Sequence, residues 1–457
     1  MQILKRIFRI IELIKTMGIG FTLVKIINNI RRNFTEFYYL YVLIWFNRSI
    51  LRFRILVSAI LNRVKIFKPH YYLYDITNAG YAIRSIAFLE VANHEGYIVT
   101  ADVADDSLSI IPVINNRFHS RTIVPLPERS APMSVAAVNS ENNHSQGLLL
   151  ATFNFDESGK IRDRTDLGMF PSIEDIYSLA NSGIKNYENS TYYKNILVRK
   201  GHWGFRCINV HETEDHKYIV TADRSTDIIY ISEFEKINDL LSDPLIHEVD
   251  ISYTEGAAEP IFCAIVPNKT ALPVYCISQR YHPDLTIISR DNSGQYVISQ
   301  RIDVGGLSRS SVAVGNFRNT RENDIALGIW GGDPGDLNSV TRGELAVCST
   351  TDNRTYSSPV IHKAGIHPTD VVAGDFDGDG LDELAVLNYG SGIHYTDRIH
   401  PGNIQIFKYV GDEFIIIDQI NVPHPRIGIS KDIDNDGKDE LIVSLFFDKC
   451  LVGIKLS

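Results

Sequence analysis

The sequence predicts an all-β fold, a seven-bladed β-propeller preceded by a basic amphipathic helical arm. Near residue 70 the hydrophobic period changes from 3.6 residues to the two-residue alternation of strands. Similar strand segments then recur about every 50–70 residues, and two nearly identical acidic loops lie near the end of the chain. We therefore expect two parts, an arm over residues 1–68 and a propeller over residues 69–457.

The arm is basic, whereas the rest of the chain is acidic. Residues 1–70 contain 13 Lys and Arg and only two acids, a net charge of +11 within a chain whose total is −10. Apolar and polar side chains fall on opposite faces of two predicted helices, which are separated by Gly18 and Gly20. Opposite charge in the two parts indicates that they have separate tasks.

The apolar runs that follow these helices do not suit a membrane span. Phe37–Phe46 is only ten residues long, and Ile50–Leu61 contains Arg52 and Arg54. A spanning helix needs about 20 apolar residues, and an arginine at the bilayer centre costs about 2.5–3.5 kcal/mol. No signal-peptide pattern is visible. We expect peripheral attachment to a membrane surface, on a side that the sequence does not specify. Docking on a partner subunit or on the propeller itself is the alternative, and a true span is least favoured.

Seven similar strand segments divide the body into units of about 50–60 residues, each with room for four strands. Most follow a second short strand, as blades of a propeller do. The segments are YIVTAD (Tyr97–Asp102), LLLATF (Leu148–Phe153), YIVTAD (Tyr218–Asp223), LPVYCI (Leu272–Ile277), IALGIW (Ile325–Trp330), LAVLNY (Leu384–Tyr389) and LIVSLF (Leu441–Phe446).

The last unit is one strand short, which indicates how the ring closes. After Leu441–Phe446 only CLVGIKLS remains. We expect Tyr71–Thr77 to supply the missing outer strand, so that both chain ends share one blade. The second unit is too long, and Ser172–Gly183 predicts a helical insertion near residues 170–185.

The two acidic loops, DFDGDGLDELAV and DIDNDGKDELIV, have the spacing of a cation site. Oxygen ligands at positions 1, 3 and 5, a glycine at 6 for the sharp turn, a carbonyl at 7 and a later acid supply six or seven ligands. Without a cation the carboxylates would repel one another. The predicted ligands are Asp375, Asp377, Asp379, the Leu381 carbonyl and Glu383, and Asp432, Asp434, Asp436, the Lys438 carbonyl and Glu440.

With their flanks, VAGDFDGDGLDELAV and KDIDNDGKDELIV, these loops resemble the FG-GAP/VCBS repeat of integrin α-subunit propellers and many bacterial surface propellers. The resemblance implies two structural Ca²⁺ sites in the last two blades. A solvated acidic turn and Mg²⁺ are the alternatives. The family more often has Asp at the ninth position, where this chain has Glu. In the fifth unit, NFRNTREND, Arg318 replaces a ligand, and we expect its guanidinium to take the place of the cation and bridge to Asp324.

Long loops between second and third strands should gather on the face opposite the acidic loops. Aromatic, Arg and Asp side chains of this kind bind polar ligands or protein partners, although a solvated loop is the plainer interpretation of any single residue. The candidate ligand-binding residues are Trp330, Asp333, Arg342, Tyr389, His394, Tyr395 and Arg398.

These features favour a non-enzymatic, calcium-stabilised binding or scaffold module that recognises a protein or glycan partner and is held in place by its arm. The alternative is a polysaccharide-active enzyme, either a lyase using Tyr395 with Arg398 or a hydrolase using Asp333 with Asp397. No catalytic or nucleotide-binding motif is recognisable, and the acidic body argues against nucleic acid.

The five cysteines are scattered and lack CxxC spacing, which favours buried free thiols over disulfides or zinc. Cys263 and Cys276 could face each other on adjacent strands.

Overall fold

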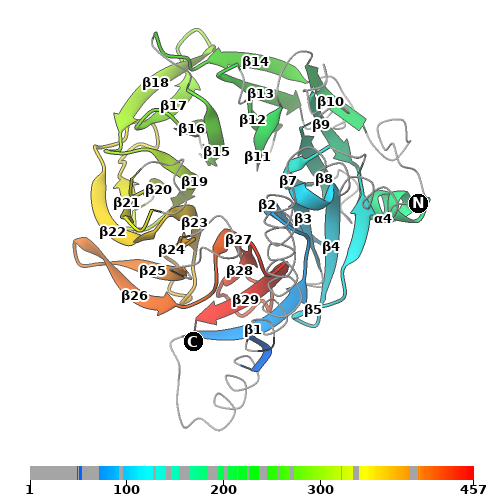
Figure 1. Cartoon of the computed structure of the whole chain (residues 1–457). Helices are drawn as coiled ribbons and strands as arrows, with labels where there is room; N and C mark the ends of the chain where they lie inside the picture. Colours follow the sequence, from blue (N-terminus) through cyan, green and yellow to red (C-terminus); the bar gives the residue numbers. More distant parts are fainter. Residues whose placement is uncertain are drawn as a thin grey trace, which may run out of the picture.

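The computed structural model contains seven antiparallel sheets arranged as blades around a central axis, which confirms the seven-bladed β-propeller (Figure 1). It describes residues 49, 51–53, 71–91, 96–126, 130–139, 146–153, 165–182, 194–199, 204–213, 215–223, 226–235, 244–254, 258–267, 272–320, 322–332, 339–391, 400 and 402–456. We number the blades one to seven in chain order.

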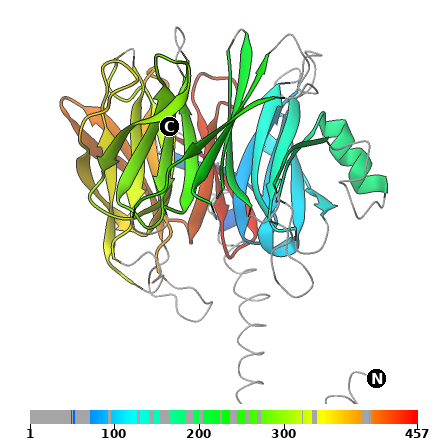
Figure 2. The same ribbon diagram turned by 90° about the horizontal axis from the view of Figure 1, so that it is seen from above.

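Each blade is a meander that begins at the axis and ends at the rim (Figures 1 and 2). Blade one contains β2 (Ile83–Glu90), β3 (Gly96–Asp102), the 3-10 turn η3 (Val103–Asp105), β4 (Ser107–Ile114), β5 (Arg117–Phe118) and β6 (Thr122–Pro125). Blade two contains β7 (Pro132–Asn139), β8 (Gln146–Thr152), β9 (Thr165–Phe170) and β10 (Lys194–Arg199). Blade three contains β11 (Phe205–Glu212), β12 (His216–Asp223), β13 (Ile228–Glu235) and β14 (Leu245–Asp250).

The remaining blades repeat this order. Blade four contains β15 (Pro260–Val266), β16 (Val274–Gln279), β17 (Asp284–Arg290) and β18 (Tyr296–Asp303). Blade five contains β19 (Ser308–Gly315), β20 (Asp324–Ile329), β21 (Arg342–Cys348) and β22 (Val360–Ile366). Blade six contains β23 (Pro368–Gly374), β24 (Glu383–Asn388), β25 (Asn403–Val410) and β26 (Glu413–Ile420).

Blade seven joins the two ends of the described propeller. Its inner three strands are β27 (Pro425–Lys431), β28 (Glu440–Leu445) and β29 (Cys450–Leu456), and its outer strand is β1 (Tyr71–Asn78). The register runs from Tyr71 opposite Leu456 to Asn78 opposite Cys450. The expected sharing of one blade is thus confirmed, and it leaves no unpaired gap in the ring.

Seven apolar clusters fill the seven seams between neighbouring blades in the described part of the chain. The second strand of each blade lies between two such clusters, so its side chains are buried on both faces. For example, Ile98 and Val99 of β3 are both fully buried and belong to different seams. Two-sided burial explains why these strands are continuous apolar runs, and hence why they were visible as repeats.

One helix lies outside the ring, at the rim. Helix α4 (Ile173–Ser182) connects β9 to β10 and projects from blade two (Figure 2). Ser172 caps it by accepting a hydrogen bond from the Asp175 N–H at 3.2 Å. Its apolar face, including Ile176 and Leu179, packs into the seam between blades one and two.

Of the predicted arm, the structure describes only Ser49 and the helical residues Leu51–Phe53. Leu51 is 3% exposed and packs into the cluster between blades six and seven. The rest of the expected helical arm lies outside the described residues. Within the described part, no helix has the length and apolar character that crossing a membrane requires.

All five cysteines are buried free thiols, as expected. The predicted facing of Cys263 and Cys276 is wrong, because the register places Cys276 opposite Ala264. Instead Cys263 lies beside Cys207 on the neighbouring inner strand, with 2.9 Å between the two sulfur atoms.

Candidate functional site

Both acidic loops connect the inner strand of a blade to its second strand, β23 to β24 and β27 to β28. The turns need backbone conformations that favour glycine. Gly378, Gly380 and Gly437 have φ values of 79°, 88° and 85°. The final acids of the loops, Glu383 and Glu440, are the first residues of the second strands.

The first aspartate of each loop holds the turn together. One carboxylate oxygen of Asp375 accepts hydrogen bonds from the N–H groups of Gly378 at 2.7 Å and Asp379 at 3.1 Å, and the other accepts from Gly380 at 2.9 Å. Asp432 likewise accepts from the N–H groups of Asp436 and Gly437. These bonds stabilise the loop conformation from within.

The loops bring together most of the predicted ligands. Carboxylate oxygens of Asp375, Asp377 and Glu383 lie within 4.8 Å of one another, and those of Asp432, Asp434 and Glu440 do the same. At the carbonyl positions, the N–H of Leu381 donates to Asp379 and that of Lys438 donates to Asp436.

A lysine from the third strand occupies the centre of the first loop. Leu384 pairs with Phe407, so Lys408 of β25 lies across from Glu383. Its Nζ lies 2.7 Å from Asp379 Oδ2 and 2.8 Å from Glu383 Oε1, and it also donates to Asp377. The ammonium therefore contacts three of the four carboxylates that the sequence predicted as ligands of a metal ion.

The second loop has the same arrangement. Leu441 pairs with Ile454, which places Lys455 of β29 across from Glu440. The Lys455 Nζ lies 2.6 Å from Asp434 Oδ2, 2.8 Å from Asp436 Oδ2 and 2.6 Å from Glu440 Oε1.

Blade five uses an arginine from the loop itself. Arg318 Nε lies 2.6 Å from Asp324 Oδ2, and Nη2 lies 2.8 Å from Oδ1. Asp324 is fully buried. The expected bridge between these side chains is confirmed, and the hydrogen bonds to Asp324 raise the pKa of Arg318.

Burial and pairing act in opposite directions on the charged groups. Burial raises the pKa of Glu383 to about 7, against the hydrogen bond from Lys408. Burial alone would lower the pKa of Lys408, but its three carboxylate partners outweigh this effect and raise it. Lys455 follows the same pattern. Both ammonium groups therefore stay charged at neutral pH.

The oxygen-rich loops fit a hard cation in the kind and number of their donors. The lysines do not fit it. Ca²⁺ would bind these oxygens at about 2.3–2.6 Å and would then lie against an ammonium that contacts three of the same carboxylates.

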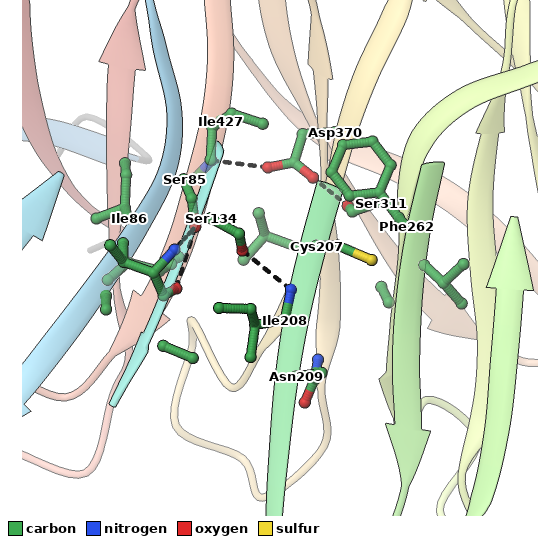
Figure 3. Close-up of a pocket in the computed structure, with 18 of the residues that line it drawn as sticks. Ser85, Ile86, Ser134, Cys207, Ile208, Asn209, Phe262, Ser311, Asp370 and Ile427 are labelled. Atoms are coloured by element: carbon green, nitrogen blue, oxygen red, sulfur yellow. Dashed lines mark hydrogen bonds between the residues drawn. The ribbon is translucent and has the colours of Figure 1, made fainter. Parts of the chain in front are cut away.

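The seven inner strands also line a central channel of about 550 Å³. Figure 3 shows side-chain hydrogen bonds that link these strands around it. The Ser134 hydroxyl accepts from the Ile208 N–H at 3.0 Å. The Asp370 carboxylate accepts from the Ser311 hydroxyl and from the Gly428 N–H at 2.7 Å, so it joins blades five, six and seven.

Arginines occupy the same place at one end of several inner strands. Arg84, Arg206 and Arg426 are the second residues of β2, β11 and β27. The Arg426 guanidinium carbon lies 6.0 Å from the ring centre of Tyr389 and 5.7 Å from that of Phe446. We call this end, where the inner strands begin and second-to-third-strand loops start, the channel mouth.

Two of the residues predicted to bind a ligand are packed into this end of the fold. Trp330 is 4% exposed and stacks on His367, with 4.5 Å between ring centres. Tyr389 is 2% exposed and packs against His424. Arg342 is exposed at the start of β21. The other four candidates, Asp333, His394, Tyr395 and Arg398, lie outside the described residues.

Sequence reasoning did not identify Lys408, Lys455 or Arg426. A signal for the lysines was present, since each follows an apolar strand segment, IQIF and LVGI, downstream of its acidic loop. The repeated placement of Arg after the first residue of an inner strand was the corresponding signal for the channel mouth.

No protein-family model matches the chain, and no curated protein matches it. Among solved structures, it is similar to the crystal structure of a protein from Lactobacillus plantarum, with 13% sequence identity and a TM-score of 0.41. The match covers 75% of this chain and 86% of that one. The FG-GAP/VCBS resemblance therefore remains a sequence-based expectation, whereas the seven blades follow from the sheet topology itself.

Proposed function

We propose that this propeller is a non-enzymatic binding module that recognises a carboxylate-bearing partner at the channel mouth. The observation that carries the proposal is the environment of Arg426. Its side chain is half-buried, its Nε is fully buried, and no described residue hydrogen-bonds to that atom. A buried nitrogen that donates no hydrogen bond is costly, and a bound anion would accept a hydrogen bond from it.

The neighbouring acid offsets the charge of Arg426 only in part. Asp370 is close enough to influence it, but its two oxygens already accept hydrogen bonds from Ser311 and Val371 on one side and from Gly428 on the other. Burial raises the pKa of Asp370 to about 7, so this carboxyl is only partly charged at neutral pH.

The surroundings of Arg426 suit a carboxylate. A planar guanidinium binds carboxylates with two parallel hydrogen bonds. The aromatic rings of Tyr389 and Phe446 fix the guanidinium from one side through cation–π contact. Arg84 and Arg206 line the channel, which Arg426 adjoins through Ile427, and add positive charge. Acidic protein segments and acidic glycans both carry the required group.

The arm would hold this module at a membrane surface or in an assembly. Its basic amphipathic sequence suits an anionic lipid surface. Leu51, which packs between blades six and seven, would couple the arm to the propeller.

The test uses the full chain and two variants, Arg426→Met and Arg354→Ala. Arg426→Met keeps the apolar stem and removes the charge, while Arg354 is an exposed arginine between β21 and β22, at the opposite end of the strands from the mouth. Acidic and neutral peptides, and uronate and neutral oligosaccharides, are titrated against each by calorimetry. We expect binding of one acidic class, weakened at least about tenfold by Arg426→Met, the loss of roughly one charge-assisted hydrogen bond.

Arg354→Ala should bind like the wild type. Selective binding of acidic peptides would identify a protein partner, and selective binding of uronates a glycan partner. Equal affinity of wild type and Arg426→Met, or binding of neutral probes alone, would refute the proposal. Liposome flotation with anionic and neutral vesicles tests the arm, and absence of binding to both would exclude the lipid surface.

A further inference from the structure

We infer that the cations of the loops in blades five, six and seven are the chain's own Arg318, Lys408 and Lys455, so these blades are held together without a metal ion. This inference is independent of the proposed partner. It replaces the calcium that the loop pattern led us to expect.

The three blades share one feature, a buried acid with a cationic partner at an equivalent position. Each has a buried acid at the first position of its second strand, Asp324, Glu383 or Glu440, exposed by 0%, 0% and 2%. A buried carboxylate needs a compensating charge. In every case one cationic side chain donates to that acid.

The strand register decides which residue supplies the cation. The third-strand residue opposite Glu383 is Lys408, and the one opposite Glu440 is Lys455. In blade five Ile325 pairs with Cys348, so the corresponding third-strand residue is Ser349, which carries no charge. There the loop itself supplies Arg318. Where the third strand has no lysine, the loop supplies an arginine. This replacement indicates that the buried acid needs a cation beside it.

The acids that remain in the loops do not require a further cation. The side chains of Asp377 and Asp379 are 34% and 44% exposed, and those of Asp434 and Asp436 are 28% and 45% exposed. Water screens their repulsion. The lysines are the buried partners, with side chains that are 18% and 7% exposed for Lys408 and Lys455.

Hydrogen bonds between neighbouring blades also fix the loops. Asp439 donates its N–H to the Asp375 carbonyl at 2.8 Å and accepts the Asp375 N–H at 3.2 Å. Asp382 makes the same pair of bonds with Asn316, at 3.1 Å and 2.8 Å. One backbone–backbone hydrogen bond and one hydrogen bond to a carboxylate therefore join the loop of each blade to the loop of the previous blade.

The experiment compares the full chain in EDTA and in millimolar Ca²⁺. Thermal unfolding is followed by circular dichroism, and Ca²⁺ binding by calorimetry and Tb³⁺ luminescence. We expect the wild type to melt at the same temperature in both conditions and to bind no Ca²⁺ at micromolar concentration. This measurement needs no variant.

Substitution of Lys408 tests whether its ammonium group takes the place of Ca²⁺ in the loop. Lys408→Ala should melt at a lower temperature than the wild type in EDTA and regain stability in Ca²⁺. It should bind one Ca²⁺ at least about tenfold more tightly than the wild type does, since one charge-assisted hydrogen bond corresponds to roughly that factor. Lys431→Ala is the matched control, because Lys431 pairs with Glu90 at an exposed site. Tight binding of two Ca²⁺ by the wild type, with a higher melting temperature in Ca²⁺, would overturn the inference. So would unchanged calcium affinity in a folded Lys408→Ala protein.

Discussion

Replacing Arg318 with Met should destabilise the propeller more than the loss of an exposed ion pair would. The guanidinium makes two hydrogen bonds to Asp324 and a third to the Thr350 carbonyl at 3.1 Å. Without it, the Thr350 N–H at 3.0 Å is the one remaining donor to the fully buried Asp324 carboxylate among the described residues. Removing one partner of a buried ion pair costs about 3–5 kcal/mol, and we expect a loss of unfolding free energy in that range.

Asp324→Asn should cost less, about 1–3 kcal/mol, because the Arg318 side chain is 23% exposed and water can solvate it. The double variant should be more stable than the sum of the single losses predicts, since neither charge then remains buried alone. A coupling free energy of about 1.5 kcal/mol or more is expected for a hydrogen-bonded charge pair.

The assay is guanidinium chloride unfolding followed by circular dichroism, with the unfolding free energy extrapolated to water. Arg354→Ala is the control, an exposed arginine in the same blade, and should stay within about 0.5 kcal/mol of the wild type. A loss below about 1 kcal/mol for Arg318→Met, or additive single effects in the double variant, would show that Asp324 is not held by a buried charge pair.

Two further predictions concern ring closure and pH. A chain that begins at residue 79 lacks β1, the outer strand of blade seven. The amide hydrogens of Cys450–Leu456 should therefore exchange faster than in a chain that begins at residue 69. Equal protection in the two chains would show that β1 is dispensable. Burial raises the pKa of Asp102 to about 7, above its ordinary value in the unfolded chain. Unfolding therefore releases a proton between about pH 4 and 7, and the free energy of unfolding falls as pH rises through this range. Asp102→Asn should remove up to about 1.4 kcal/mol per pH unit of that slope, measured by urea unfolding at each pH, whereas an unchanged slope would contradict the assignment.

The repeat architecture was predictable because its cause is local. Each second strand is buried on both faces, so it appears in the sequence as an apolar run, and seven such runs at similar spacing indicate seven blades. The bridge between Arg318 and Asp324 was predictable for the same reason, since only six residues separate the two side chains.

The facing of Cys263 and Cys276 was wrong because it depended on register. Adjacent strands bring many pairs of residues near one another, and the hairpin fixes which pairs are opposite. The actual sulfur neighbour, Cys207, belongs to another blade and is 56 residues away from Cys263. No local pattern contains that information.

The sequence by itself determined the strands, the blade repeat and the acidic character of the two loops, since these depend on periodicity and on residues close together in the chain. Only the tertiary structure decided what stands at the centre of each loop. Lys408 is 25 residues from Glu383, and Lys455 is 21 residues from Asp434. Strand pairing places each ammonium against its carboxylates, because the register of the third strand fixes which side chain faces the buried acid.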